Sequence, residues 1–265
     1  MAAATRAAER ESRMADDVTP VSMLLRYWSL KVPTLEGTAS VGVHSYKCRT
    51  PAYGGTVNEE RIKDAFIGVS KKKIIDEAGG SNPYVEAFVG KASPETFERV
   101  LALVYQYREA FVSAYGKSHT EPYKTCAKIL SADAKPEWIL QTFCDKYMGL
   151  DCNGFVGNFV AKADHSLKLK SNSSIQYEFF HKKKALRASA DQVQAKDLII
   201  WSNFQHIASI DVGLNDEFLV CQSTAGGPQA SRNSFVYHPK QKLFSIEPSP
   251  VKFVGKVHIV SVGLS

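Results

Sequence analysis

The chain has 265 residues, of which 44% are hydrophobic and 23% are charged, and this mixture supplies a sizeable apolar core and excludes a chain that is disordered throughout. The 33 Lys and Arg residues outnumber the 27 Asp and Glu residues, which gives a formal net charge of +6. The short basic runs at residues 71–73 and 181–184 lack the interleaved aromatic residues of a nucleic-acid module, so we expect solvated faces and no nucleic-acid partner.

The N-terminal residues predict neither a signal peptide nor a membrane anchor. Charges at Arg6, Glu9 and Arg10 leave no apolar core of the kind that a secretory signal needs. No run of about 18 apolar residues occurs in the sequence, so we expect no integral membrane segment. The protein is therefore expected to be cytoplasmic as synthesised, or exported by a route that does not use an N-terminal signal peptide. The sequence leaves the oligomeric state open.

The first part of the chain predicts a short disordered start and then helices. Residues 1–18 are rich in Ala, Arg and Glu without periodicity, and we expect them to be disordered. Residues 19–145 form the predicted helical region. Its clearest helices cover residues 59–78, 93–116 and 136–148. The second of these begins with Ser93 as a cap and Pro94 in the first turn. Aromatic residues at helical spacing, Trp138 among them, are expected to pack in the core.

Residues 146–265 predict a second domain, in which one helix precedes a series of short strands. The helix is expected at residues 151–163. The strands are expected at residues 198–201, 207–210, 218–221, 235–237 and 257–262. The connections between successive strands are too short for parallel crossovers, so the sheet is expected to be antiparallel. The fold class that follows is α+β, with helices first and strands last.

The cysteines show no disulfide or metal-binding pattern. They lie at positions 48, 126, 144, 152 and 221. None forms a C-x-x-C pair, and no histidine has a second ligand at the spacing of a metal site. We therefore expect no metal and no cofactor. Four of the five cysteines are interpreted as buried core residues, and only Cys152 departs from that interpretation.

Cys152 lies in a segment that suits a nucleophile. Asp151 precedes it, Gly154 follows, and an apolar run at helical spacing comes next. This order predicts a cysteine in the first turn of a helix. There the unpaired backbone N–H groups and the positive end of the helix dipole stabilise a thiolate.

A thiolate nucleophile also needs a base and a group that orients the base. His206 directly precedes the strand predicted at residues 207–210, so its ring can face the start of the helix. Gln222 ends the next strand, and its amide oxygen can accept a hydrogen bond from the ring N–H of His206. His165 and His181 are alternative bases, although neither precedes a strand-like run.

Together these residues resemble the NlpC-type family of papain-like cysteine peptidases and amidases, many of which cleave peptides of bacterial cell walls. The family's Asp-Cys-Ser-Gly motif is matched at residues 151–154, with Asn153 in place of Ser. Its Gly-Asp-Leu motif, which precedes the histidine, is matched at residues 196–198 with Lys196 in place of Gly. The third, polar position falls on Gln222. The resemblance covers roughly residues 145–225, under a third of the chain.

The resemblance implies a papain-like fold, in which the helix that bears the nucleophile packs on an antiparallel sheet. It implies that Cys152 attacks an amide carbonyl, that His206 receives the thiol proton and passes it to the leaving amine, and that Gln222 orients His206. The backbone N–H of Cys152 would help to hold the oxyanion.

Three further residues are expected at the oxyanion hole or the cleft: Asp151, Asn153 and Tyr147. Asn153 can cap or hydrogen-bond locally as Ser does. For Tyr147, five residues before the nucleophile, a place in the core is an equal alternative.

The function that follows is a cysteine hydrolase that cleaves amide bonds in peptidoglycan peptides, as an endopeptidase or amidase or as a secreted antibacterial effector. Its expected partner is a peptide or peptidoglycan substrate, and the positive net charge suits an anionic wall. Two alternatives stay open. One is a catalytically inactive papain-like binding module, and the other is a cysteine hydrolase or deamidase that acts on a protein.

Overall fold

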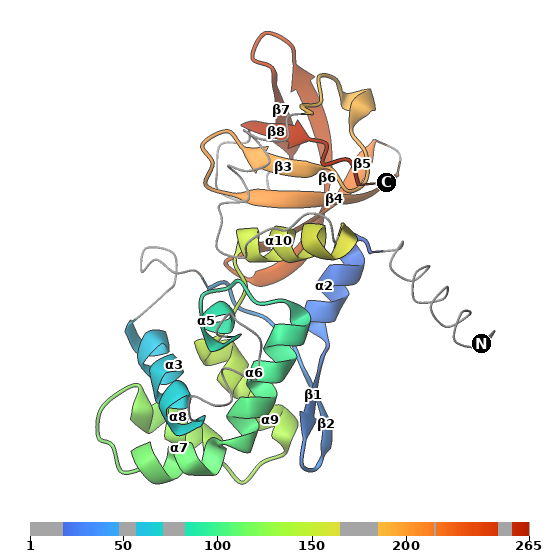
Figure 1. Cartoon of the computed structure of the whole chain (residues 1–265). Helices are drawn as coiled ribbons and strands as arrows, with labels where there is room; N and C mark the ends of the chain where they lie inside the picture. Colours follow the sequence, from blue (N-terminus) through green and yellow to red (C-terminus); the bar gives the residue numbers. More distant parts are fainter. Residues whose placement is uncertain are drawn as a thin grey trace, which may run out of the picture. The chain divides into compact units, whose positions relative to one another are not determined.

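The computed structural model describes residues 18–47, 57–70, 83–164, 185–214, 216–248 and 256–264. It combines α-helices with antiparallel sheets, which confirms the α+β class, although two strands, at residues 30–34 and 37–41, precede most of the helices (Figure 1). Two compact units are formed. The helical unit comprises residues 26–154 and 223–228, and the barrel unit comprises residues 1–25, 155–222 and 229–265. The domain boundary expected between residues 145 and 146 stays a prediction.

Several of the expected features lie outside the described residues. They are most of the N-terminal segment 1–18, both basic runs, Cys48, and the two alternative bases His165 and His181. Among the residues that the structure does describe, none of the helices combines the length and the hydropathy needed to cross a lipid bilayer.

The helical unit is built around stacked aromatic side chains. Its helices are α3 (Val57–Ser70), α5 (Pro83–Phe88), α6 (Pro94–Gln106), α7 (Arg108–Tyr115), α8 (Tyr123–Leu130) and α9 (Pro136–Tyr147), together with the end of α2 (Pro20–Trp28). The ring of Phe66 on α3 stacks on Phe111 at 4.7 Å and meets Phe143 edge-on at 5.5 Å between centroids. These contacts confirm the predicted core role of the aromatic residues on three helices.

Two details of the helices differ from the prediction. The helix expected at residues 93–116 is two helices, α6 and α7, which meet at Tyr107. Its predicted start is confirmed, because the Ser93 hydroxyl accepts the backbone N–H of Thr96 at 3.2 Å. Trp138 is not a core residue: its neighbour Ile139 belongs to the buried face of α9, and Trp138 is 51% exposed.

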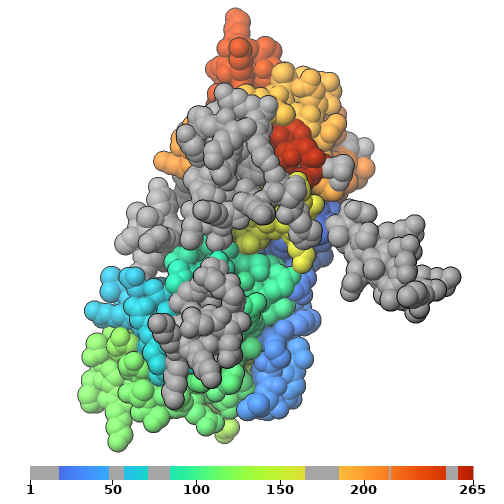
Figure 2. Space-filling model, viewed as in Figure 1, coloured from blue at the N-terminus to red at the C-terminus, as the bar shows by residue number. Residues whose placement is uncertain are grey.

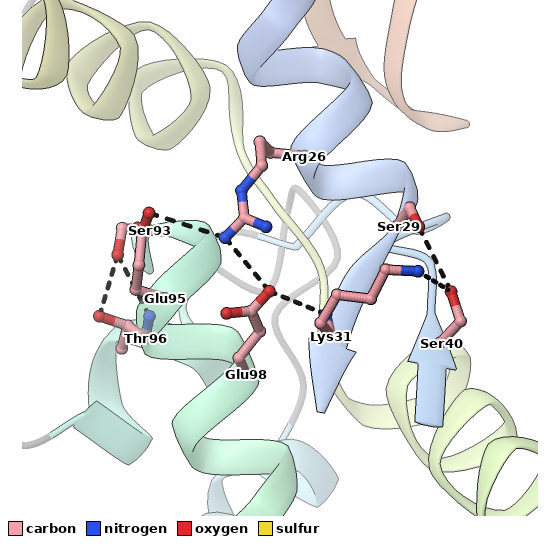
Figure 3. A network of polar contacts seen from close by, with 8 residues as sticks. All are labelled: Arg26, Ser29, Lys31, Ser40, Ser93, Glu95, Thr96 and Glu98. Atoms are coloured by element: carbon pink, nitrogen blue, oxygen red, sulfur yellow. Dashed lines mark hydrogen bonds and ion pairs between the residues drawn. The ribbon is translucent and has the colours of Figure 1, made fainter. Parts of the chain in front are cut away.

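A hairpin of two short strands, β1 (Leu30–Thr34) and β2 (Gly37–Val41), contacts α6 within the helical unit and is coloured blue in Figure 2. A polar network holds it there (Figure 3). Glu98 on α6 accepts the backbone N–H of Lys31 at 2.8 Å and forms an ion pair with Arg26 at 3.2 Å. Glu98 thereby satisfies a donor on the edge of the hairpin that β2 leaves open.

The barrel unit contains six strands that close into a barrel. They are β3 (Leu198–Trp201), β4 (Ile207–Leu214), β5 (Glu217–Thr224), β6 (Gly227–His238), β7 (Leu243–Glu247) and β8 (Lys256–Val260). Each strand pairs with the next along the chain, and β8 returns to pair antiparallel with β3. Apolar side chains fill the interior, among them Ile199, Ile210 and Phe244. The antiparallel pairing is as predicted, whereas the closure and the strand β7 are not.

Lys196, which precedes the buried Asp197, adopts an unusual backbone conformation. Lys196 has a φ of 69°, in the left-handed region that favours glycine. It is held in this conformation because its N–H donates to the carbonyl of Ile210 at 2.7 Å. The next residue, Asp197, is buried and accepts two hydrogen bonds of 2.9 Å from the guanidinium of Arg187.

We expect Lys196→Gly to raise the free energy of unfolding by about 0.5–1 kcal/mol. Removing the strain of the left-handed backbone stabilises the folded protein by about 1–2 kcal/mol. The greater conformational freedom of glycine in the unfolded chain offsets about 0.5–1 kcal/mol of this gain. Urea denaturation measures the change. Lys128→Gly in α8 is the control and should lower stability by about 1 kcal/mol. A loss of stability in Lys196→Gly would contradict the prediction.

Candidate active site

Cys152 is the first residue of α10 (Cys152–Ala163). The Asp151 carboxylate caps the helix and accepts the backbone N–H of Gly154 at 2.5 Å. The remaining N–H groups of the first turn and the positive end of the helix dipole favour a negative charge at this end of the helix. The local arrangement predicted for a nucleophilic cysteine is therefore present.

The glycine of the motif is required by a close approach of two backbones. A Cβ on Gly154 would lie 1.9 Å from the carbonyl oxygen of Gly90, the same oxygen that accepts the N–H of Asp151 at 3.0 Å. Gly90 itself has a φ of 77°, and a Cβ there would lie 2.0 Å from the carbonyl oxygen of Lys47. Both positions must be glycine for the start of α10 to seat against residue 90.

A buried ion pair neutralises the capping carboxylate. Lys91 Nζ lies 2.5 Å from Asp151 Oδ2, and both side chains are largely buried. Burial raises the pKa of the Asp151 carboxyl, while Lys91 and the backbone N–H groups that it accepts oppose that rise. Removing either partner would leave an uncompensated charge beside the first turn of α10.

Cys152 is 2% exposed, and the side chains of Tyr46 and Asn153 are among the described groups that approach its sulfur. The Tyr46 hydroxyl lies 3.8 Å from Sγ, and Asn153 Nδ2 lies 3.9 Å from it. Tyr46 was not predicted, because nothing in its local sequence marks it and it is far from Cys152 along the chain. Tyr147, which was considered for the cleft, packs instead against Phe143 in the helical core, and its hydroxyl donates to the carbonyl of Pro122.

His206 and Gln222 form the hydrogen bond that the sequence predicts. His206 Nε2 lies 2.7 Å from Gln222 Oε1, and both side chains are buried. An amide oxygen can only accept, so Nε2 carries the proton and Nδ1 keeps a lone pair for a proton from a thiol. One step along the register from the pair Ser209 and Cys221, Gln222 falls opposite Ala208, on the same face of the sheet as His206.

The environment of His206 keeps the ring neutral. Burial lowers the pKa of His206 to about 4, and the hydrogen bond to Gln222 opposes that fall. A neutral imidazole can accept a proton, but the lowered pKa makes His206 a weaker base than an ordinary histidine.

The structure thus forms two groups from the predicted site residues. Asp151, Cys152 and Asn153 lie at the start of α10, in the helical unit, and His206 and Gln222 lie in the barrel unit. Cys126, Cys144 and Cys221 are buried, as expected of core residues, and burial raises the pKa of each thiol. Within the described part of the chain, no three His, Cys, Asp or Glu side chains form a cluster that could hold a metal ion.

Comparisons with protein-family models, with curated proteins and with solved structures give no match to this chain. The functional argument therefore depends on the residues and their geometry.

We expect Gly154→Ala to lower the free energy of unfolding by about 2 kcal/mol or more, since the new methyl group would overlap the carbonyl of Gly90 and displace the start of α10. Chemical denaturation measures this loss. Gly68→Ala, in α3, is the matched control: a Cβ there meets nothing within 4 Å, so helix propensity should stabilise this variant by up to about 1 kcal/mol. Equal effects of the two substitutions would contradict the close approach.

The burial of neutral His206 also predicts a pH dependence of stability. The pKa of His206 is about 4 in the folded protein and 6.5 for an unperturbed histidine, so the unfolded chain binds a proton first as the pH falls. Above pH 6.5 this difference contributes its full amount to the free energy of unfolding. As the pH falls from 6.5 toward 4, the free energy of unfolding decreases by about 3 kcal/mol. Urea unfolding at a series of pH values measures it. His206→Gln, which cannot titrate, should lose less stability over this range, and parallel curves would contradict the assignment.

Proposed function

We propose that the protein is a cysteine hydrolase that cleaves amide bonds, with Cys152 as nucleophile and His206 as general base. The observation that carries the proposal is the buried hydrogen bond of 2.7 Å between His206 and Gln222. It leaves Nδ1 of a neutral imidazole as a proton acceptor, the arrangement that a base for a thiol needs. The cap of Asp151 on the helix that begins at Cys152 supports the same reading.

The proposed reaction has two steps. His206 takes the proton of the Cys152 thiol, and the sulfur attacks the carbonyl carbon of the amide while the backbone N–H of Cys152 donates to the oxyanion. The C–N bond then breaks, the amine leaves with the proton from His206, and an acyl thioester remains. Water, deprotonated by His206, hydrolyses the thioester and restores the thiol. Gln222 keeps the ring of His206 in one orientation throughout.

A papain-like architecture is part of this proposal. In chain order, a helix bearing the cysteine is followed by antiparallel strands that carry the histidine and a polar orienting residue. The departures from the family motif have local explanations. Lys196 adopts the left-handed backbone that glycine adopts most easily, and Asn153 lies in the first turn of α10.

We propose peptides of peptidoglycan as the substrate. The motif at residues 151–154 supports this choice, and the net charge of +6 would draw the protein to an anionic wall. A second candidate is a binding module of the same fold without activity. The nearly complete burial of Cys152 favours it, because a nucleophile must be reached by its substrate.

Alkylation of Cys152 by iodoacetamide tests the catalytic pair. The assay uses a Cys48→Ser background, in which burial keeps the pKa of Cys126, Cys144 and Cys221 high and their reaction slow. We expect Cys152 to react at pH 6 at least about tenfold faster than an ordinary thiol of pKa about 8.5. His206→Ala should abolish this excess, and Gln222→Ala should reduce it.

Cys144→Ala is the control and should leave the rate unchanged. If Cys152 reacts as an ordinary thiol with or without His206, the catalytic pair does not exist and the binding module is the better proposal. If the pair exists, purified peptidoglycan incubated with the protein should gain free amino groups, and Cys152→Ala should release none. Release from a denatured protein but not from peptidoglycan would assign the activity to a protein substrate.

A further inference from the structure

The hairpin of β1 and β2 has one closed edge and one open edge. On β1, the N–H of Lys31 points away from β2 and donates to Glu98 on α6, and Pro33, the next residue that faces outward, has no N–H. In an antiparallel pair, the residues opposite these two also direct their backbone groups away from the partner strand. On β2 they are Ser40 and Thr38. Within the described part of the chain, no group pairs with the N–H or C=O of either residue.

Only β1 carries the residues that protect an edge from pairing with another chain. Proline and charged side chains have this effect on natural edge strands, and β1 contains both, in Lys31 and Pro33. Strand β2 has the sequence Gly-Thr-Ala-Ser-Val, and its Thr38 and Ser40 are exposed. The open edge, formed by Thr38 and Ser40, can therefore accept one further strand.

A side-chain amide already pairs with the chain just beyond this edge. Gly42 lies two residues after Ser40 and faces the same way. Gln141 on α9 accepts the N–H of Gly42 at 2.8 Å through Oε1 and donates to its carbonyl at 2.9 Å through Nε2. A carboxamide has the donor and the acceptor of a peptide group. An extended peptide would continue the same pairing along Ser40 and Thr38.

A cation lies at the open edge. Lys31 extends across the exposed face of the hairpin, and its Nζ lies 3.3 Å from Ser40 Oγ (Figure 3). Among the described residues, no carboxylate forms an ion pair with this ammonium group. Side chains of directly opposite residues in an antiparallel pair project to the same face. Lys31 therefore favours an acidic side chain at the peptide position opposite Ser40.

An exposed aromatic residue of α9 lies toward the same edge. Gln141 is beside Gly42, and the carbonyl of Asp145, one turn later, accepts the hydroxyl of Ser45 at 3.0 Å. The helix and the strand therefore run side by side in the same direction. Trp138 is half-exposed and precedes Gln141 by one turn on the same side of the helix, which places it toward the open edge. Alternate peptide residues project to the buried face of β2, which contacts α9, so apolar side chains suit these positions.

We propose that the open edge of β2 binds an extended peptide as a third, antiparallel strand, with acidic side chains facing Lys31 and apolar side chains facing Trp138. Main-chain hydrogen bonds to Thr38 and Ser40 provide the pairing, and the alternation of acidic and apolar side chains fixes the register. The surface belongs to the helical unit alone. The inference does not rest on the proposed function, so Cys152→Ala should bind the same peptide with the same affinity.

Fluorescence anisotropy of a labelled pentapeptide, Val-Glu-Val-Glu-Val with blocked ends, measures binding to the full chain. In the proposed register the N–H groups of the glutamates point toward β2 and those of the valines point away. N-methylation of both glutamates should weaken binding at least about tenfold, because two main-chain donors are lost. N-methylation of two valines is the matched control and should change the affinity by less than about twofold.

Three results of this measurement would overturn the proposal. They are no saturation by the unmodified peptide below about 1 mM, equal losses for the two methylated peptides, and a loss confined to the peptide with methylated valines. The last result would indicate parallel pairing or contact with another surface.

Charge reversal tests the chemistry of the partner. At low salt, Lys31→Glu should weaken binding of the glutamate peptide at least about fivefold and should favour Val-Lys-Val-Lys-Val instead. Lys128→Glu makes the same change on an exposed position of α8 and is the control, which should leave both affinities unchanged. An equal response to the two substitutions would contradict the role of Lys31.

Sedimentation of the full chain distinguishes a peptide from a second copy of the protein. A dimer that Ser40→Pro dissociates, in a protein that does not bind the peptide, would assign the open edge to self-association and overturn the proposal. Peptide binding by a monomer, lost in Ser40→Pro because the N–H that pairs with the peptide is removed, is the expected result.

Discussion

The register of the antiparallel strands β3, β4 and β5 is the constraint on which the proposed chemistry depends. In this register His206 lies opposite Trp201 and diagonal to Gln222, so the three side chains share one face. A slip of one residue would turn each side chain of β4 to the other face of the sheet. In a dry interior a satisfied hydrogen bond is strong and an unsatisfied one is costly. The register therefore sets both the orientation and the charge state of the imidazole.

The start of α10 depends on a constraint of another kind, a contact between two backbones. Gly154 and Gly90 approach so closely that neither tolerates a side chain, and the N–H of Asp151 bonds to the carbonyl of Gly90. Asp151 then serves as helix cap and as the partner of Lys91. A buried ion pair is costly unless further hydrogen bonds satisfy it. Here the Asp151 carboxylate also accepts the backbone N–H of Gly154. This cap and the close approach of the two glycine backbones together determine the position of Cys152.

The elements that were predicted correctly carry strong local signals. Strand β3 is an unbroken apolar run, and α6 begins with a Ser cap followed by Pro. Residues 39–46 alternate in a strand-like way and overlap the end of β2, but β1 was missed because Pro33 interrupts it, and proline is usually evidence against a strand. The division of one predicted helix at Tyr107 was missed because apolar periodicity continues across it. Strand β7 is short, and its pairing with β6 and β8 compensates for a weak pattern.

The amino-acid sequence by itself determined the capped cysteine helix, the antiparallel strands and the candidates Cys152, His206 and Gln222. The helix and the strands follow from patterns among residues a few positions apart, and the three candidates follow from short motifs that a linear sequence records. Only the tertiary structure decided that Gly90 and Lys91 support Asp151, that Tyr46 rather than Tyr147 approaches the thiol, and that Trp201 packs on His206. The first two of these join residues far apart in the chain, and the third depends on strand register. Such contacts exist only once the elements have packed, because burial and pairing then choose among neighbours that the sequence leaves open.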